Sequence, residues 1–280
     1  MIVYYIDDKV GVNHAKLGKF PGGEVMVSTQ PHHNPAGVSE IDVCASTRNS
    51  DELMQLIMFI DAAKRQFNNA VIDVVIPYFP YARQDRVCNP GESHSLAVVA
   101  KMLNTTGARF TVIDPHSDVL GAVLDRVNVV TLADLYRQKI LNLPDFHNLD
   151  ALISPDAGAL KKVAKLAEVH YQLTGKQIPV IVANKKRDLA TGRITESTLS
   201  EPVDDMRVLV VDDICDGGAT FIALSNLLVK AKYKALYVTH GIFSKGVAAV
   251  SQFYDEIYTT NSFNPELESE GNLIVSESFY

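Results

Sequence analysis

The chain has 280 residues, of which 47% are hydrophobic and 21% are charged, a balance typical of a globular protein with one large domain or two ordinary ones. A formal net charge of −7 argues against a general nucleic-acid-binding or anionic-membrane surface, so any phosphate site has to be built from local basic residues. Three cysteines without metal-ligand or disulfide spacing indicate a reducing, cytoplasmic location, and no apolar stretch approaches the ~20 residues that cross a bilayer.

The first half of the chain alternates between strand and helix patterns. A first strand is expected at residues 2–6, and the turn at 19–25 fits an ordinary hairpin. The helix at 49–67 has a capping-box pattern at its start and apolar residues at helical spacing. The elements expected after it are a buried strand at 71–79, a helix at 93–105, strands at 110–113 and 127–131, and a helix at 132–141. This alternation predicts an α/β fold with a parallel sheet and a domain boundary near 142–145.

Polar residues follow two of these strands. The run 83–86 (Arg-Gln-Asp-Arg) comes after the strand at 71–79, at the end of a parallel sheet where ligands bind. Arginine forks suit phosphate oxygens and Gln84 could serve a base or a ribose, whereas the alternative is a solvated charged turn. His116 lies two residues from a carboxylate at the next strand end, which suits either a metal or phosphate contact or a structural role.

The second half repeats the plan of strand, polar tip and helix. A strand at 151–155 ends in Asp156-Ala157-Gly158, and a helix to about residue 171 and a strand at 179–183 follow. The polar stretch 184–205 has three consecutive basic residues at 185–187. It is predicted to be either disordered filler or a lid that binds anions. Later expected elements are strands at 235–239, 256–260 and 273–276 and a short helix at 246–252.

The most informative stretch is 208–220, where an apolar strand ends in Asp212 and Asp213 and a small-residue turn leads to Thr220 and an amphipathic segment. Such a strand-loop-helix unit presents backbone N–H groups that fit a phosphate. Carboxylates beside a phosphate make sense if they bind sugar hydroxyls or a divalent cation, and the alternative is turn chemistry alone.

This stretch resembles the ribose-phosphate loop of the type I phosphoribosyltransferase fold. The run 76–86 (Ile-Pro-Tyr-Phe-Pro-Tyr-Ala-Arg-Gln-Asp-Arg), the run 154–158 and the basic residues after 184 resemble the ribose-phosphate diphosphokinase family, also called phosphoribosyl pyrophosphate synthetases, in order and spacing. The resemblance implies two layered parallel-sheet α/β domains. They are expected to be an ATP-binding domain at 1–141, joined by the C-terminal strand at 266–280, and a ribose-5-phosphate-binding domain at 142–265.

The resemblance also implies a reaction, in which the diphosphoryl group of ATP passes to ribose 5-phosphate with Mg²⁺ as cofactor and AMP as product. The implied ATP-binding residues are Phe20, Glu24, Arg83, Gln84, Asp85 and His116. The implied ribose-5-phosphate-binding residues are Asp156, Asp212, Asp213, Asp216, Gly217, Gly218, Ala219 and Thr220. His116 and Asp156 are the implied metal contacts, Lys185 and Arg187 are the implied catalytic pair on a mobile loop, and the 20–24 turn is expected to complete the adenine site of a neighbour in a homo-oligomer.

Some positions depart from the family pattern. Gly22 stands where the family has Asn or Asp, Gly217 where it has Thr, and Ala219 where it has Gly, so single base and phosphate contacts are expected to be missing. The run 114–117 reads Asp-Pro-His-Ser in place of Asp-Leu-His-Ala, and a closing helix is not expected, which bears on assembly and allosteric control. Two alternatives stay open, a phosphoribosyltransferase and a non-catalytic, synthetase-like regulatory subunit.

Overall fold

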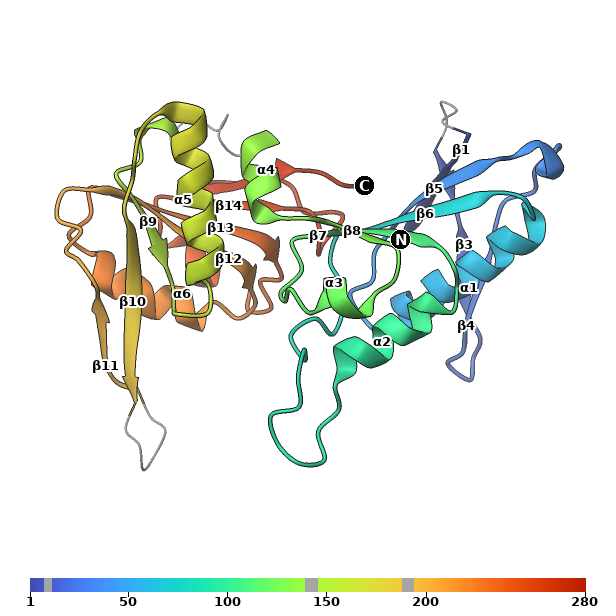
Figure 1. Cartoon of the computed structure of the whole chain (residues 1–280), viewed down its shortest axis with the longest axis horizontal. Helices are drawn as coiled ribbons and strands as arrows, with labels where there is room; N and C mark the ends of the chain where they lie inside the picture. Colours follow the sequence, from blue (N-terminus) through green and yellow to red (C-terminus); the bar gives the residue numbers. More distant parts are fainter. Residues whose placement is uncertain (8–11, 139–145, 188–193) are drawn as a thin grey trace. The chain divides into compact units, whose positions relative to one another are not determined.

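The computed structural model describes residues 1–7, 12–138, 146–187 and 194–280, with residues 138, 185–187 and 194–196 described by their backbone alone. The chain forms two compact units, one of residues 1–130 with 279–280 and the other of residues 131–278 (Figure 1). The expected linker at 142–145 lies outside the described residues. None of the helices in the described ranges is long and apolar enough to cross a membrane.

Unit 1 is a six-stranded sheet in the order β2-β1-β5-β6-β7-β8, with β5 to β8 parallel and β1 antiparallel to both of its neighbours. Because the parallel strands follow one another in chain order, right-handed crossovers place their connecting helices on one face (Figure 1). Its elements are β1 (Ile2–Ile6), β2 (Asn13–His14), β3 (Lys16–Lys19), β4 (Val25–Ser28), β5 (Glu40–Ala45), α1 (Ser50–Gln66), β6 (Val71–Ile76), α2 (Ser95–Asn104), β7 (Arg109–Ile113), α3 (Leu120–Val123) and β8 (Val127–Val130).

The helix predicted at 49–67 is confirmed as α1, and its start follows from local chemistry. The Asn49 side chain accepts a hydrogen bond from the backbone N–H of Glu52 at 3.0 Å, which satisfies a helix-end donor. Leu56, Phe59 and Ile60 lie on its buried face and are at most 1% exposed. This apolar stripe packs into the core of unit 1 and holds the parallel strands beneath it.

Unit 2 is a seven-stranded sheet in the order β11-β10-β9-β12-β13-β14-β15, parallel except for β11. Its elements are α4 (Leu132–Gln138), β9 (Ala151–Ser154), α5 (Leu160–Thr174), β10 (Val180–Arg187), β11 (Ile194–Leu199), β12 (Arg207–Cys215), α6 (Ala219–Ser225), β13 (Tyr233–Gly241), α7 (Ala248–Ser251), β14 (Glu256–Thr260) and β15 (Leu273–Glu277). From β9 the chain moves to β10 on one side, and from β12 it moves to β13 on the other. The strand order therefore reverses between β9 and β12, which makes their carboxyl ends the switch point where such sheets bind ligands.

The observed fold differs from several expectations. The first domain was expected to extend to residue 141, but the unit boundary lies between residues 130 and 131, so α4 belongs to unit 2. Residues 266–280 were expected to join the first unit, but β15 pairs in parallel with β14, so that strand completes the sheet of unit 2 and only residues 279–280 belong to unit 1. The start of the polar stretch 184–205 is not disordered filler, because residues 183–187 pair with residues 194–199 as antiparallel strands. Its role as a lid that meets anions stays a prediction. β-Branched residues such as Thr195 and Thr198 favour this strand despite its polar character.

Candidate active site

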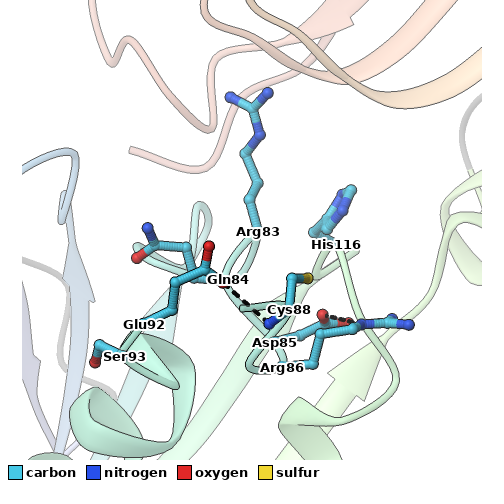
Figure 2. A pocket seen from close by; sticks show the side chains of 8 residues that line it. All are labelled: Arg83, Gln84, Asp85, Arg86, Cys88, Glu92, Ser93 and His116. Atoms are coloured by element: carbon cyan, nitrogen blue, oxygen red, sulfur yellow. Dashed lines mark hydrogen bonds and ion pairs between the residues drawn. The ribbon is translucent and has the colours of Figure 1, made fainter. Parts of the chain in front are cut away.

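The loop after β6 forms a cavity of about 470 Å³ in unit 1 (Figure 2). The loop has a fixed start, because Tyr81 has a φ of +61° and its carbonyl accepts a hydrogen bond from the N–H of Gln84 at 3.1 Å. The carbonyl of Gln84 in turn accepts from the N–H of Leu96 at the beginning of α2, at 3.2 Å. The cavity is lined by Arg83, Gln84, Asp85, Arg86, Cys88, Glu92, Ser93 and His116. It thus gathers four of the residues predicted to bind ATP.

Those four residues come from two loops that neighbouring strands bring together. β6 and β7 are adjacent and parallel, so the loop carrying Arg83 and the loop carrying His116 leave the same edge of the sheet. In Figure 2 the side chains of Arg83 and His116 extend toward the same side of the cavity. Both side chains are exposed, so a ligand in the cavity can reach a guanidinium and an imidazole at once.

Asp85 is held within the loop by Arg86. The guanidinium donates to both carboxylate oxygens of Asp85, at 2.7 and 2.9 Å, and the Asp85 side chain is only 10% exposed (Figure 2). This forked pairing, with a hydrogen bond from Ser117, holds the pKa of Asp85 well below its usual range. Asp85 is therefore ionised at neutral pH and fixes the orientation of Arg86 in the cavity wall.

The predicted adenine-contacting turn lies apart from this cavity lining. Phe20 and Glu24 form the tip of the β3–β4 hairpin, where the N–H of Phe20 donates to the carbonyl of Glu24 at 2.8 Å and Gly23 has a φ of +101°. Phe20 is 52% exposed at this tip, and neither residue lines the cavity. Its role at a neighbour's site stays a prediction.

In unit 2 the predicted carboxylates meet at the switch point. Asp156 follows β9, and its Oδ1 accepts from the N–H groups of Gly158 and Ala159 at 2.9 and 3.1 Å. Asp212 and Asp213 lie near the end of the adjacent strand β12. Burial, followed by repulsion from Asp213, raises the pKa of Asp212 to about 8. The arrangement places carboxylate charge where sugar hydroxyls or a hard cation would relieve it.

The loop predicted to bind the sugar phosphate runs from Asp216 to Thr220. Gly218 has a φ of +77°, and a Cβ there would come within 2.3 Å of the Val250 Cγ2 atom, so this position requires glycine. At Gly217 a Cβ would make ordinary contacts, the nearest being the Lys245 Cε atom at 3.5 Å. Residues 216–218 thus form a tight turn between β12 and α6, and Ala219 and Thr220 begin α6. The binding role of the run 216–220 stays a prediction.

Lys185 and Arg187 belong by their backbone to β10, where they pair with Ser197 and Ile194 of β11. Their side chains lie outside the described residues. The catalytic role predicted for the two cations, and the metal contacts predicted for His116 and Asp156, stay predictions.

Two family models match the chain. The N-terminal domain of ribose phosphate pyrophosphokinase matches residues 4–107, and the phosphoribosyl transferase domain matches residues 125–250. A ribose-phosphate pyrophosphokinase of Ralstonia nicotianae is 32% identical over 268 residues, which are 90% of this chain and 79% of the relative. The chain belongs to the ribose-phosphate pyrophosphokinase family.

Other members of the ribose-phosphate pyrophosphokinase family agree with this assignment. The enzyme of Halalkalibacterium halodurans is 28% identical over 253 residues, covering 87% of this chain and 75% of the relative. The crystal structure of phosphoribosylpyrophosphate synthetase from Mycobacterium smegmatis superposes with a TM-score of 0.79 at 25% identity, over 95% of this chain and 86% of that chain. The predicted two-sheet α/β fold of the type I phosphoribosyltransferase kind is confirmed.

Two residues at the candidate sites of this chain, Glu92 and Lys162, were not among the predicted site residues. Glu92 accepts hydrogen bonds from the N–H groups of Cys88 and Asn89, both at 3.0 Å, and so closes a turn at the cavity rim. The run Asn89-Pro90-Gly91 is a sequence pattern typical of turns and could have predicted the turn that Glu92 closes. Lys162 of α5 places its Nζ atom 3.6 Å from Asp213 Oδ2, and only the parallel pairing of β9 with β12 brings this pair together.

The acidic pair should reduce the stability of the fold at high pH. Because the pKa of Asp212 is raised, the folded chain keeps a proton that the unfolded chain releases, and the free energy of unfolding falls as pH rises from about 4 to about 8. Asp212→Asn should raise the free energy of unfolding by about 1–2 kcal/mol at pH 8 and by nearly nothing near pH 4. Urea unfolding followed by circular dichroism across this range measures the difference, and a pH-independent gain would contradict it.

Proposed function

We propose that the chain is a ribose-phosphate diphosphokinase. The anomeric hydroxyl oxygen of ribose 5-phosphate would attack the β-phosphorus of ATP, the bond from that phosphorus to the AMP oxygen would break, and the hydroxyl proton would be lost. The products are 5-phosphoribosyl 1-diphosphate and AMP. Chemistry of this kind depends on positioning and charge neutralisation more than on covalent catalysis.

The observation that carries the proposal is the cavity of unit 1. It joins Arg83 and Gln84 from one loop with His116 from another, and these groups suit the phosphates and the base or ribose of a nucleotide. A phosphoribosyltransferase accounts for the acidic loop of unit 2 but leaves this cavity, and the match of residues 4–107 to the N-terminal domain of the family, without a role.

Unit 2 would hold the sugar phosphate. Asp212 and Asp213 offer acceptors for ribose hydroxyls, and the backbone N–H groups of the run 216–220 suit the 5-phosphate. Lys185 and Arg187 would close over the reacting β-phosphorus and offset its developing charge. Asp216 and Thr220 would orient the sugar phosphate at the two ends of the loop.

Mg²⁺, the cofactor that the family resemblance implies, fits the carboxylates of unit 2. Oxygen ligands are those that Mg²⁺ prefers, and Asp156 and Asp212 are close enough for the charge of one to raise the pKa of the other. When bound, Mg²⁺ would supply positive charge that offsets the negative charge of the phosphates. We propose Asp156 as a ligand, with His116 contacting the nucleotide phosphates and the metal.

Magnesium-dependent formation of AMP from ATP and ribose 5-phosphate tests the proposal. The expected result is stoichiometric AMP and 5-phosphoribosyl 1-diphosphate, with no AMP when ribose 5-phosphate is omitted. A phosphoribosyltransferase would instead consume 5-phosphoribosyl 1-diphosphate in the presence of a base and make no AMP from ATP. A non-catalytic regulatory subunit would bind ATP without either reaction.

The nucleotide site can be tested by Arg83→Ala. Loss of a charged phosphate contact should raise the KM for ATP by about 10- to 30-fold while the KM for ribose 5-phosphate stays within about twofold. Arg65→Ala is a matched control, because the Arg65 side chain is 78% exposed and pairs with Asp61 on α1. Equal KM values for ATP in the Arg83 variant and in this control would remove Arg83 from the nucleotide site.

The assembly is proposed from the exposed hairpin tip. Phe20 is a half-exposed aromatic ring on a short hairpin, and in a homo-oligomer it would contact the adenine bound by a neighbour. Phe20→Ala should then weaken ATP binding although the residue lies outside its own chain's cavity. An unchanged KM for ATP in an intact oligomer would contradict this arrangement.

A further inference from the structure

The segment after β13 is fastened to the loop predicted to bind the sugar phosphate. The N–H groups of Ile242 and Phe243 donate to the carbonyl of Cys215 at 2.9 and 3.1 Å, and the N–H of Ser244 donates to the carbonyl of Asp216 at 3.1 Å. These three backbone hydrogen bonds fix residues 242–244 beside the beginning of the loop.

A tight turn then sets the position of Lys245. The N–H of Gly246 donates to the carbonyl of Phe243 at 2.7 Å, and Phe243 and Gly246 have φ values of +47° and +81°. The Lys245 backbone is therefore held within a four-residue turn and not in a free loop. Its position relative to Gly217 follows from the fold of unit 2 alone.

The Lys245 side chain passes alongside Gly217. An ideal Cβ at Gly217 would lie 3.5 Å from the Lys245 Cε atom and 3.6 Å from its Cδ atom, with Ser244 Oγ at 3.7 Å. A side chain larger than alanine at this position would therefore compete with the lysine for space. The absence of a side chain at Gly217 lets the lysine approach the loop backbone.

The acidic residues near the 216–220 loop suggest a role for the positive charge of Lys245 in phosphate binding. Asp216 belongs to the loop, Asp212 and Asp213 lie near the end of β12 just before it, and the Lys162 Nζ atom lies 3.6 Å from Asp213 Oδ2. A phosphate dianion on the loop therefore needs a further positive charge, and Lys245 is exposed at the loop edge. An ammonium on a flexible stem whose Cε is already beside the loop can reach a phosphate oxygen.

We propose that Lys245 is a phosphate-binding residue for the 5-phosphate of ribose 5-phosphate and occupies the space that Gly217 leaves open. This inference rests on the proposed function, because it takes the ligand of the 216–220 loop to be a sugar phosphate. It adds a cation that none of the loop's own residues supplies.

The test is isothermal titration of ribose 5-phosphate into the full chain. Lys245→Met removes the charge and keeps the length, and it should weaken binding by about tenfold. Lys245→Arg should stay within about threefold of the parent, because a guanidinium also binds phosphate. The parent should also show a steeper loss of affinity with added salt than the Met variant.

Lys232→Met is the matched control. It removes the same charge at an exposed residue before the amino end of β13, roughly 30 Å along the strand from Lys245. Its affinity for ribose 5-phosphate and the affinity of all variants for ATP should equal those of the parent. Equal affinity in Lys245→Met and the parent, or equal losses in the Met and Arg variants, would overturn the inference and leave the proposed function standing.

The two proposals fail in different ways. If the parent binds ribose 5-phosphate through Lys245 but makes no AMP, the proposed reaction falls and the binding role of Lys245 stands. If the parent binds no ribose 5-phosphate, the inference is overturned together with the assignment of the 216–220 loop.

Discussion

Lys185→Ala is expected to lower kcat by ~100-fold or more, with little change in the affinity for ribose 5-phosphate. The proposed role of Lys185 is to offset charge that develops on the reacting phosphoryl group, so its loss raises the barrier more than it weakens ground-state binding. Initial rates of AMP formation at saturating ATP and ribose 5-phosphate, with titration calorimetry for binding, measure both quantities.

Lys232→Ala is the control for Lys185, since it removes an exposed lysine that lies just before the amino end of a different strand, β13. It should leave kcat unchanged. Arg187→Ala should resemble Lys185→Ala, because both cations are proposed to act on the same phosphoryl group. Unchanged turnover in the Lys185 variant would remove the β10–β11 hairpin from the mechanism.

Gly218→Ala is expected to lower the free energy of unfolding of unit 2 by about 2–4 kcal/mol. The φ of +77° costs about 1–2 kcal/mol for any residue with a Cβ, and overlap with the buried Val250 methyl adds to this. The turn at 216–220 has to shift to relieve the overlap, so ribose 5-phosphate should also bind more weakly. Urea unfolding and titration calorimetry measure the two effects.

Gly217→Ala is the matched control, because a Cβ there meets the Lys245 stem at an ordinary contact distance and φ is not in the left-handed region. It should change stability by less than about 1 kcal/mol. Combining Gly218→Ala with Val250→Ala should cost less than the sum of the two single changes, since the second removes the methyl that the first meets. Additive costs would show that the overlap with Val250 is not the cause.

Local sequence patterns predicted most of the helices and strands, because each pattern lies within a short stretch of consecutive residues. The capping pattern at Asn49 and the apolar stripe of α1 are examples. β5 is absent from the predicted elements although Glu40-Ile41-Asp42-Val43 alternates polar and apolar residues. The place of β15 could not be predicted locally, since a short apolar strand satisfies either sheet and only its pairing with β14 decides.

Some residues of the candidate site could also be predicted from local sequence, whereas others depend on long-range contacts. Arg83, Gln84 and Asp85 are found by sequence because they are consecutive and follow a strong strand. Lys162 and Lys245 are not, because each reaches its loop from another element, through the adjacency of β9 and β12 or the backbone bonds after β13. Such long-range contacts leave no periodic or motif signal in the chain.

ATP labelled at its β-phosphorus tests the central proposal most directly. If the chain transfers the β,γ-diphosphoryl group, the label leaves the nucleotide in the presence of Mg²⁺ and ribose 5-phosphate and appears in 5-phosphoribosyl 1-diphosphate, while AMP is unlabelled. Label retained in ADP would indicate transfer of the γ-phosphoryl group, and label retained in ATP would indicate no reaction. Either result would contradict the proposed chemistry.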